Sequence, residues 1–444
     1  MPPESTSYKN ILSIAYPIIL GSIAQNVVII TDTAFLGRVG ESQLGAAGNG
    51  GLLYFIMILV GFGFSLGSQI IIGRRNGEQN FSAIGKILDN SLLFLLLVAF
   101  VFFIFSLFFS EPIIKLIVTS PEVHSGVSDY IHYRSFGIFF GLFNAGMNSF
   151  FVGVTNTRII TWSNVIMAVV NIFLDYGMIF GNFGFPQMGV KGAALASALS
   201  EMTASGVLLA YLFIKVDLIK YQIFRFVNLA IAPMKEILRI AAPVMLQHFM
   251  ALAAWLVFFS IIEHMGIRQL AISHIARSVY LLMILPVFGF SSASSTLVSN
   301  LLGQKQPQLV IQVIFRSIHL ALLTVLVIAP LIYLFPEKLI SVYSNNSQLI
   351  SEAVPVLYVI TTAMFFLAIS FVVFYSVSGT GNTWISLLIE IISLIVYLLF
   401  TYFVAFRWQM PLKIVWCAEF VYFIMIGSLS AFYLRFGKWR DALV

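Results

Sequence analysis

The chain has 444 residues, of which 60% are hydrophobic and 9% are charged. Soluble domains carry about 45–50% apolar and about 25% charged residues, so this composition, with a mean hydropathy of +0.98, excludes an ordinary water-soluble enzyme. The 24 Lys and Arg outnumber the 18 Asp and Glu, but they are scattered along loops without a basic stripe, which argues against nucleic-acid binding. The single cysteine, Cys417, excludes an internal disulfide and a thiolate metal site. We therefore expect an integral membrane protein.

Long apolar segments divide the chain into two sets of six. A spanning helix needs about 20 mostly apolar residues, and uninterrupted segments of this length do not alternate as barrel strands would. The predicted fold is all-α, with a six-helix N-terminal lobe at 1–214, a cytoplasmic linker at 215–235 and a six-helix C-terminal lobe at 236–444. The twelve expected transmembrane helices lie near 11–35, 49–73, 87–110, 127–152, 159–181, 190–214, 236–263, 271–299, 311–334, 350–378, 385–407 and 411–436.

The loops on the two sides of the predicted membrane differ in charge. An even number of spans places both termini on one side, and the loops of that side carry roughly twice as many Lys and Arg as the others. The positive-inside rule then predicts a multi-pass protein of the cytoplasmic (inner) membrane with both termini in the cytoplasm. The first ten residues lack the layout of a signal peptide.

The second half of the chain repeats the first at a constant offset of 226 residues. Ile11–Gly77 aligns without a gap with Ile237–Gly303, and the same offset superimposes a Gly-x-x-Asn-Thr motif at 153–157 on one at 379–383. Because each half has an even number of spans, both share one topology, which is the plan of transporters with a substrate site between parallel repeats. No phosphate-binding loop is present, so we expect transport driven by an ion gradient, or downhill transport.

Acidic residues inside the spans are candidates for function, because a carboxylate in hydrocarbon is costly. Asp32 and Asp175 stand at the same outward level of the first half, Asn171 lies one helical turn before Asp175, and Ser197 can add an oxygen. Paired carboxylates take up a proton, and oxygen ligands suit a hard cation such as Na⁺. We predict a coupling-ion site at Asp32, Asn171, Asp175 and Ser197, the first three being the Na⁺ ligands if sodium is used. The alternative is that Asp32 and Asp175 only tie helices through backbone amides.

The second half does not repeat this cluster, because Phe258 and Thr401 stand where Asp32 and Asp175 stand in the first half. Any coupling residue of the second half must therefore lie at positions that do not correspond to Asp32 and Asp175. The acidic residues in or beside its spans are Glu263, which borders a loop, Glu390 and Glu419.

Polar and aromatic residues of the seventh span are candidates for a substrate cavity. Gln247 and Trp255 are placed to line such a cavity, where the indole can stack on an aromatic cation. We group Glu390 with them, and leave open whether Glu390 or Glu263 takes part in coupling.

Three motifs resemble those of the multidrug and toxic compound extrusion (MATE) family, and with the two-lobe plan the resemblance covers nearly the whole chain. They are TDTAFLGRVG at 31–40 with Pro17 ahead of it, NIFLD at 171–175 followed by GVKGAALAS at 189–197, and the paired Gly-x-x-Asn-Thr at 153–157 and 379–383.

The resemblance implies a V-shaped pair of six-helix lobes that exports organic cations in exchange for Na⁺ or H⁺. It implies that the predicted cluster binds the coupling ion, with Ser197 where threonine is more usual. Tyr130 and Asn148 match further polar residues of that cavity, and Pro17 matches a proline at which the first helix bends when the aspartate is protonated. The branch with an acidic residue in the seventh helix is not matched, because 251–255 reads ALAAW.

Two other functions fit the sequence less well. A lipid-linked saccharide flippase of the same superfamily would need a cationic cavity, and only Arg134 and Arg277 fall inside the predicted spans. An intramembrane aspartyl protease fails because Asp32 and Asp175 lack the Tyr-Asp and Gly-x-Gly-Asp contexts. We therefore expect a transporter and not an enzyme, with no cofactor, cationic or amphipathic small-molecule substrates, lipid around it and no obligate protein partner. The coupling ion, the substrate and the oligomeric state stay open.

Overall fold

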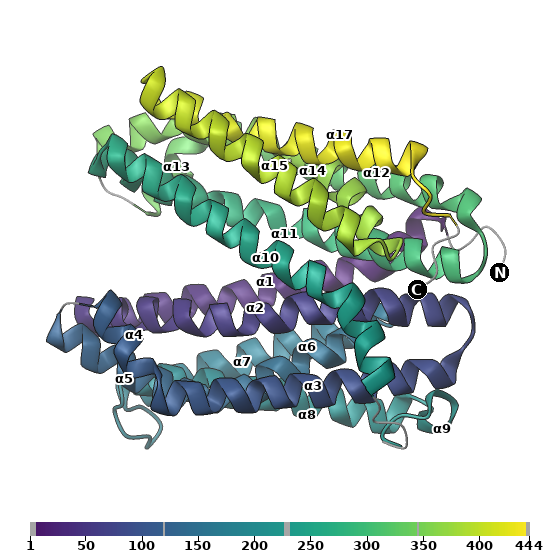
Figure 1. The fold of residues 1–444 in the computed structure, drawn as a ribbon. Coiled ribbons are helices and arrows are strands. Elements are labelled where there is room, and N and C mark those ends of the chain that lie inside the picture. The colour runs from purple at the N-terminus through teal and green to yellow at the C-terminus, as the bar shows by residue number, and fades with distance from the viewer. Residues whose placement is uncertain (1–5, 119, 226–230, 344–345, 441–444) are drawn as a thin grey trace. The chain divides into compact units, whose positions relative to one another are not determined.

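The computed structural model describes residues 6–118, 120–225, 231–343 and 346–440, and these residues form helices without any strand (Figure 1). Eleven of the described helices are long and apolar enough to cross a membrane. A twelfth span is the pair α5 (Pro121–Ser135) and α6 (Gly137–Gly153), which meet at an angle of 51°. The predicted all-α, twelve-span fold is confirmed.

The helices form two compact units, described here separately. The first unit is Leu20–Ala241, and the second contains the described residues up to Ile19 together with those from Ala242 onward. Two helices, α1 (Tyr8–Val39) and α10 (Ile231–Met265), therefore contribute to both units. This division differs from the predicted lobes, because Ile11, Ile14 and Ile19 of α1 belong to the hydrophobic core of the second unit.

The first unit is built around α2, which packs against α3, α5 and α6, while α8 packs against α5, α6 and α7. Besides parts of α1 and α10 and the pair α5 and α6, it contains α2 (Glu41–Gly77), α3 (Phe81–Phe108), α4 (Ser110–Ile117), α7 (Arg158–Phe180), α8 (Val190–Lys215) and α9 (Leu218–Tyr221).

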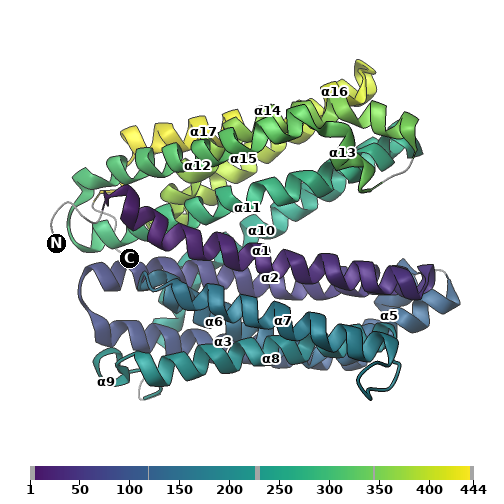
Figure 2. The ribbon, with the colours of Figure 1, turned by 180° about the vertical axis from the view of Figure 1, so that it is seen from behind.

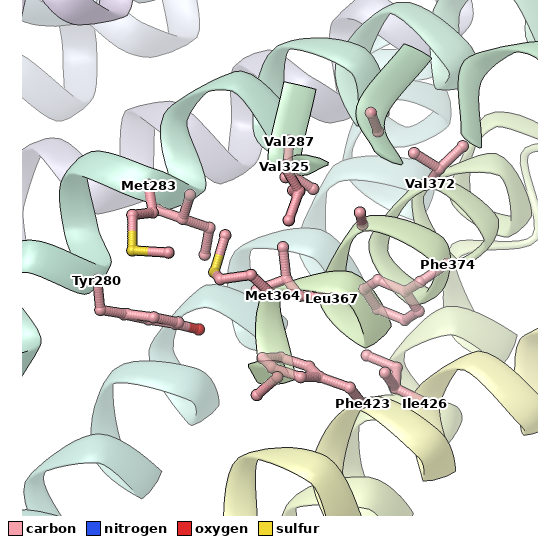
Figure 3. Packing of buried hydrophobic residues seen from close by; sticks show 14 of the residues in the cluster. Tyr280, Met283, Val287, Val325, Met364, Leu367, Val372, Phe374, Phe423 and Ile426 are labelled. Atoms are coloured by element: carbon pink, nitrogen blue, oxygen red, sulfur yellow. The ribbon is translucent and has the colours of Figure 1, made fainter. Parts of the chain in front are cut away.

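The second unit is built around α11 and α14, its most buried helices. Figure 3 shows Tyr280 and Met283 of α11 packed near Met364 and Leu367 of α14, with Phe423 of α17 beside them. In Figures 1 and 2 the start of α1 and the end of α17 lie at the same end of this unit. Its elements are α11 (Ile267–Gly303), the 3₁₀ turn η2 (Pro307–Leu309), α12 (Val310–Leu334), α13 (Pro336–Ser341), α14 (Ser347–Gly379), α15 (Thr383–Tyr402), the π-helical turn η3 (Phe403–Arg407), α16 (Leu412–Val415) and α17 (Ala418–Phe436).

The repeat seen in the sequence recurs in the backbone. Gly40 and Gly266, which are 226 positions apart, separate α1 from α2 and α10 from α11, with φ angles of 156° and 139°. A residue with a Cβ rarely adopts these angles, so a glycine is required at both breaks. The two halves thus turn their first helix pair with the same local chemistry.

The predicted linker is partly helical. Asp217 caps α9 by accepting hydrogen bonds from the backbone of Ile219 and Lys220, and the Phe224 amide donates to Asp89 Oδ1 at 2.9 Å. This part of the linker is therefore attached to α3. Residues 226–230 of the predicted linker lie outside the described residues.

Candidate functional site

The first unit encloses a cavity of about 780 Å³, a volume typical of small-molecule sites. Apolar residues such as Ile29, Phe55 and Met167 make up about half of its lining. Its polar lining residues are Gln25, Asn26, Asp32, Thr33, Tyr54, Tyr130, Arg134, Asn144, Asn148, Ser163, Asn164, Ser197, Ser200 and Glu201.

The predicted coupling-ion residues lie together at this cavity, and we call them the Asp32 cluster: Asp32, Asn171, Asp175 and Ser197. The Asn171 amide nitrogen, turned toward the carboxylates, donates to Asp32 Oδ1 at 3.1 Å and to Asp175 Oδ2 at 3.3 Å. Ser197 Oγ donates to Asp32 Oδ2 at 3.3 Å. Asp32 and Ser197 line the cavity, whereas Asn171 and Asp175 are fully buried.

Two features of this cluster favour binding of a proton or a small cation. Asp175 Oδ1 is buried and has no hydrogen-bond partner among the described residues. The carboxyl groups of Asp32 and Asp175 are also held close to each other by the Asn171 amide, which donates to both. A buried carboxylate oxygen without a partner is costly, so a bound proton or cation would relieve an unfavourable arrangement.

Small residues bring the helices of the cluster together. A Cβ on Gly192 of α8 would lie 2.7 Å from the Met178 carbonyl oxygen of α7, and a Cβ on Gly21 of α1 would lie 2.7 Å from Asn164 Nδ2. Glycine at these positions therefore permits the close approach that small residues give transmembrane helices. On α7 itself, Asn171 and Asp175 share a face because they are one turn apart.

A second charged group in the cavity wall was not predicted as part of the site. Arg134 of α5 makes a bidentate ion pair with Glu201 of α8. Nη1 donates to Oε2 at 2.8 Å, and Nη2 donates to Oε1 at 2.6 Å. The Tyr54 hydroxyl donates to Glu201 Oε2 at 2.9 Å, and the guanidinium lies 3.8 Å from the centroid of the Tyr54 ring. The sequence did carry a signal for this ion pair, because the fourth and sixth predicted spans contain residues of opposite charge.

The remaining predicted site residues fall in both units. Tyr130 and Asn148 line the cavity. Pro17 lies inside α1 in the second unit. In the same unit, Gln247 donates to the Thr383 carbonyl at 3.5 Å, and Trp255 packs against Tyr280 with ring centroids 5.8 Å apart.

The second unit also contains Glu390, which accepts a hydrogen bond from the Tyr422 hydroxyl at 2.8 Å. It is not among the residues that line the cavity of the first unit. Glu263 is exposed at the end of α10. Within the described part of the chain, no three His, Cys, Asp or Glu residues are grouped as a metal site would require.

The repeated helical fold, the buried carboxylates and the adjoining cavity together define a multi-pass membrane protein of the transporter class. The MatE family profile matches residues 17–177 and 243–403, which are two segments at the same offset of 226. The chain belongs to the MATE family, and the resemblance drawn from its motifs is confirmed.

Individual relatives agree with this assignment. The chain is 29% identical over 442 residues to the probable multidrug resistance protein NorM of Thermotoga maritima, covering 98% of this chain and 94% of the relative. It is 22% identical to the probable multidrug resistance protein YoeA of Bacillus subtilis, over 75% of this chain and 72% of that one. A solved outward-facing multidrug resistance MATE transporter of the MOP superfamily has a TM-score of 0.90 and 21% identity, covering 96% of this chain and 95% of the other. At that identity the structural likeness supports the fold alone.

Proposed function

We propose that this protein is a secondary active antiporter that exports organic cations across the cytoplasmic membrane in exchange for H⁺ or Na⁺ bound at the Asp32 cluster. Both termini face the cytoplasm in this proposal, as the loop charges predict. The relatives named as multidrug resistance proteins support a broad range of small-molecule substrates. The antiporter needs no cofactor or protein partner.

One observation carries the proposal. The buried Asp175 carboxyl has an oxygen without a hydrogen-bond partner among the described residues. Asn171 links this carboxyl to Asp32, which is partly exposed at the cavity. A proton or sodium ion bound between the two carboxylates neutralises charge at the cavity wall. Because that ion binds the outward-open and inward-open states differently, its binding shifts the balance between them and is the source of coupling.

The cavity also suits the proposed substrates. Its apolar wall can hold an organic ring system, and Asp32 supplies a negative charge to a cation. When Asp32 becomes neutral, a bound cation loses its counter-charge. Ion entry therefore favours substrate release.

The flippase alternative receives less support from the same cavity. A lipid-linked pyrophosphate would need an excess of positive charge. Among the described residues that line the cavity, Arg134 is the one Lys or Arg, and Glu201 already neutralises it. Arg277 belongs to the second unit, where its guanidinium lies 5.0 Å from the Phe259 ring centroid. Membership of a transporter family argues against the protease alternative.

The test is ethidium transport in proteoliposomes with proton and sodium gradients imposed separately. Wild-type protein should move the dye against one of these gradients, and Asp32→Asn and Asp175→Asn should lose gradient-driven transport. Asp129→Asn is the matched control, because Asp129 is a half-exposed acid of the same unit that pairs with Lys191 at 3.3 Å. Unchanged gradient-driven transport in both cluster variants would contradict the proposal.

A further inference from the structure

The second unit holds two carboxylates deep inside its membrane-spanning helices. Glu390 of α15 is 3% exposed and Glu419 of α17 is 1% exposed. Within the described chain, neither has a Lys, Arg or His within ion-pairing distance, and their polar neighbours are tyrosines. An unpaired negative charge is expensive in such a place.

The two acids are joined by tyrosines of three helices, and we call the whole group the Glu–Tyr row: Glu390, Tyr422, Tyr397, Glu419 and Tyr280. Tyr422 of α17 donates to Glu390 of α15 at 2.8 Å, while Tyr397 of α15 donates to Glu419 of α17 at 3.2 Å. Tyr280 of α11 reaches the other oxygen of Glu419 at 3.5 Å. The ring centroids of Tyr397 and Tyr422 are 5.8 Å apart, so the two hydrogen-bonded groups are in contact through their rings.

The row includes the second unit's counterpart of one residue of the Asp32 cluster. At the offset of 226, Tyr397 is the counterpart of Asn171, the residue that bridges the two aspartates in the first unit. Its neighbours include Phe258, whose ring stacks on it at 5.5 Å, and Thr401, whose hydroxyl donates to its carbonyl at 2.8 Å. These two are the counterparts of Asp32 and Asp175. The second unit therefore has no aspartate at these positions, yet it places Glu419 against the counterpart of Asn171.

We infer that the Glu–Tyr row is a second proton-binding site, separate from the Asp32 cluster. Glu390 Oε2 is buried and has no partner, so a proton there removes a charge that nothing else in the described chain neutralises. The ligand is a proton and not a metal cation, because three of the four carboxylate oxygens already accept hydrogen bonds from tyrosine hydroxyls and the one free oxygen cannot coordinate a metal ion alone. The hydroxyls of Tyr422, Tyr397 and Tyr280 already point their hydrogens at the carboxylates.

Among the residues that the structure describes, no Lys, Arg or His of the neighbouring helices acts on the two glutamates of the row. The titratable groups that face it are Tyr280 from α11, Tyr375 from α14, Tyr397 from α15 and Tyr422 from α17. From α10 come the rings of Phe258 and Trp255. A side chain that only connected two helices by hydrogen bonds would not need to be a carboxylate, since glutamine accepts the same tyrosine hydrogen bonds without a charge.

This inference rests on the proposed antiport for its role in coupling, but proton binding can be measured without transport. Infrared difference spectra of the purified protein between acidic and alkaline pH report the carbonyl band of each protonated carboxyl group. We expect one band component to vanish in Glu390→Gln and another in Glu419→Gln. Spectra that are the same in both variants as in the wild type would overturn the inference.

Two further variants separate titration from folding. Tyr397→Phe keeps both acids and should shift only the Glu419 component, whereas Tyr422→Phe should shift only the Glu390 component. Glu352→Gln is the matched control, because Glu352 is an exposed acid of the same unit that pairs with Arg268 at 2.7 Å. It should leave these band components unchanged.

The role in coupling is measured by the limiting dye gradient in proteoliposomes at zero membrane potential. Each coupled proton multiplies this gradient about tenfold for each unit of imposed pH difference. In the variant with both glutamates replaced, the limiting dye gradient per unit of imposed pH difference should be at least tenfold smaller than in the wild type. A limiting dye gradient that depends on the pH difference as in the wild type would overturn a role in coupling. If the wild type shows no transport driven by a proton gradient while the infrared bands still respond, the H⁺-driven form of the proposed antiport fails and the second proton site stands.

Discussion

Arg134 and Glu201 form a bidentate ion pair in the wall of the cavity, although their positions are 67 apart in the chain. Their side chains are 9% and 16% exposed. Both charges are therefore largely removed from solvent, and each depends on the other. The pair also connects the bend between α5 and α6 to α8, because a Cβ on Gly137 at the start of α6 would lie 2.2 Å from Arg134 Nη1.

Breaking this pair on one side should destabilise the protein more than removing both charges. Removal of one partner of a buried pair typically costs about 3–5 kcal/mol, so Arg134→Ala and Glu201→Ala should each lower the unfolding temperature in detergent. The double variant should recover part of the loss. A double-mutant cycle measures the coupling free energy, and strictly additive single effects would show that the pair is energetically unimportant.

The Ser197 hydroxyl should set how tightly the Asp32 cluster binds a proton. It donates to Asp32 Oδ2 at 3.3 Å, and a hydrogen bond to a charged group contributes about 1.5–3 kcal/mol. Because this hydrogen bond stabilises the charged form of Asp32, Ser197→Ala should tighten proton binding and lower the half-saturating proton concentration by roughly tenfold or more, while Ser197→Thr keeps the hydroxyl and should remain close to the wild type. The measurement is the half-saturating ion concentration, and equal values for the two variants would refute a role for this hydroxyl.

Pro17 should set the flexibility of the first helix. Proline removes one backbone hydrogen bond from a helix interior, and Pro17 lies inside α1 close to Ile19, where the helix passes from one unit to the other. Pro17→Ala should slow gradient-driven dye efflux while leaving the unfolding temperature equal or higher. Pro355→Ala, inside α14 and within one unit, is the control. A similar loss of rate in both variants would argue against a special role for Pro17.

The contact of α14 with α11 should tolerate no side chain at Gly379. A Cβ there would lie 2.4 Å from the Ser295 carbonyl oxygen and 2.9 Å from its Cα, so the backbone itself would have to move. Gly379→Ala should cost about 1–3 kcal/mol of unfolding free energy, as overpacking usually does. Gly206→Ala meets nothing within 4 Å and should be neutral or slightly stabilising. Thermal unfolding of the two variants in the same detergent checks this difference.

Local patterns in the sequence determined the class of fold. Span length and hydropathy depend on consecutive residues, because each helix must satisfy its own backbone in lipid, so the helices could be located without knowledge of their neighbours. The offset of 226 showed the duplication for the same reason, since it compares short segments directly. The spacing of Asn171 and Asp175 placed both on one helical face, and Asp32 and Ser197 were identified as polar residues inside two other predicted spans.

Only the tertiary structure decided which distant residues meet. The sequence contained Arg134 and Glu201 within different spans, but the rotation and depth of α5 against α8 paired them. The same holds for Glu419, whose neighbours Tyr397 and Tyr280 come from two other helices. It also holds for the start of α1, which packs in the second unit although the chain order predicted the first. Side-chain contacts between helices depend on packing across many residues at once, and no local pattern encodes them.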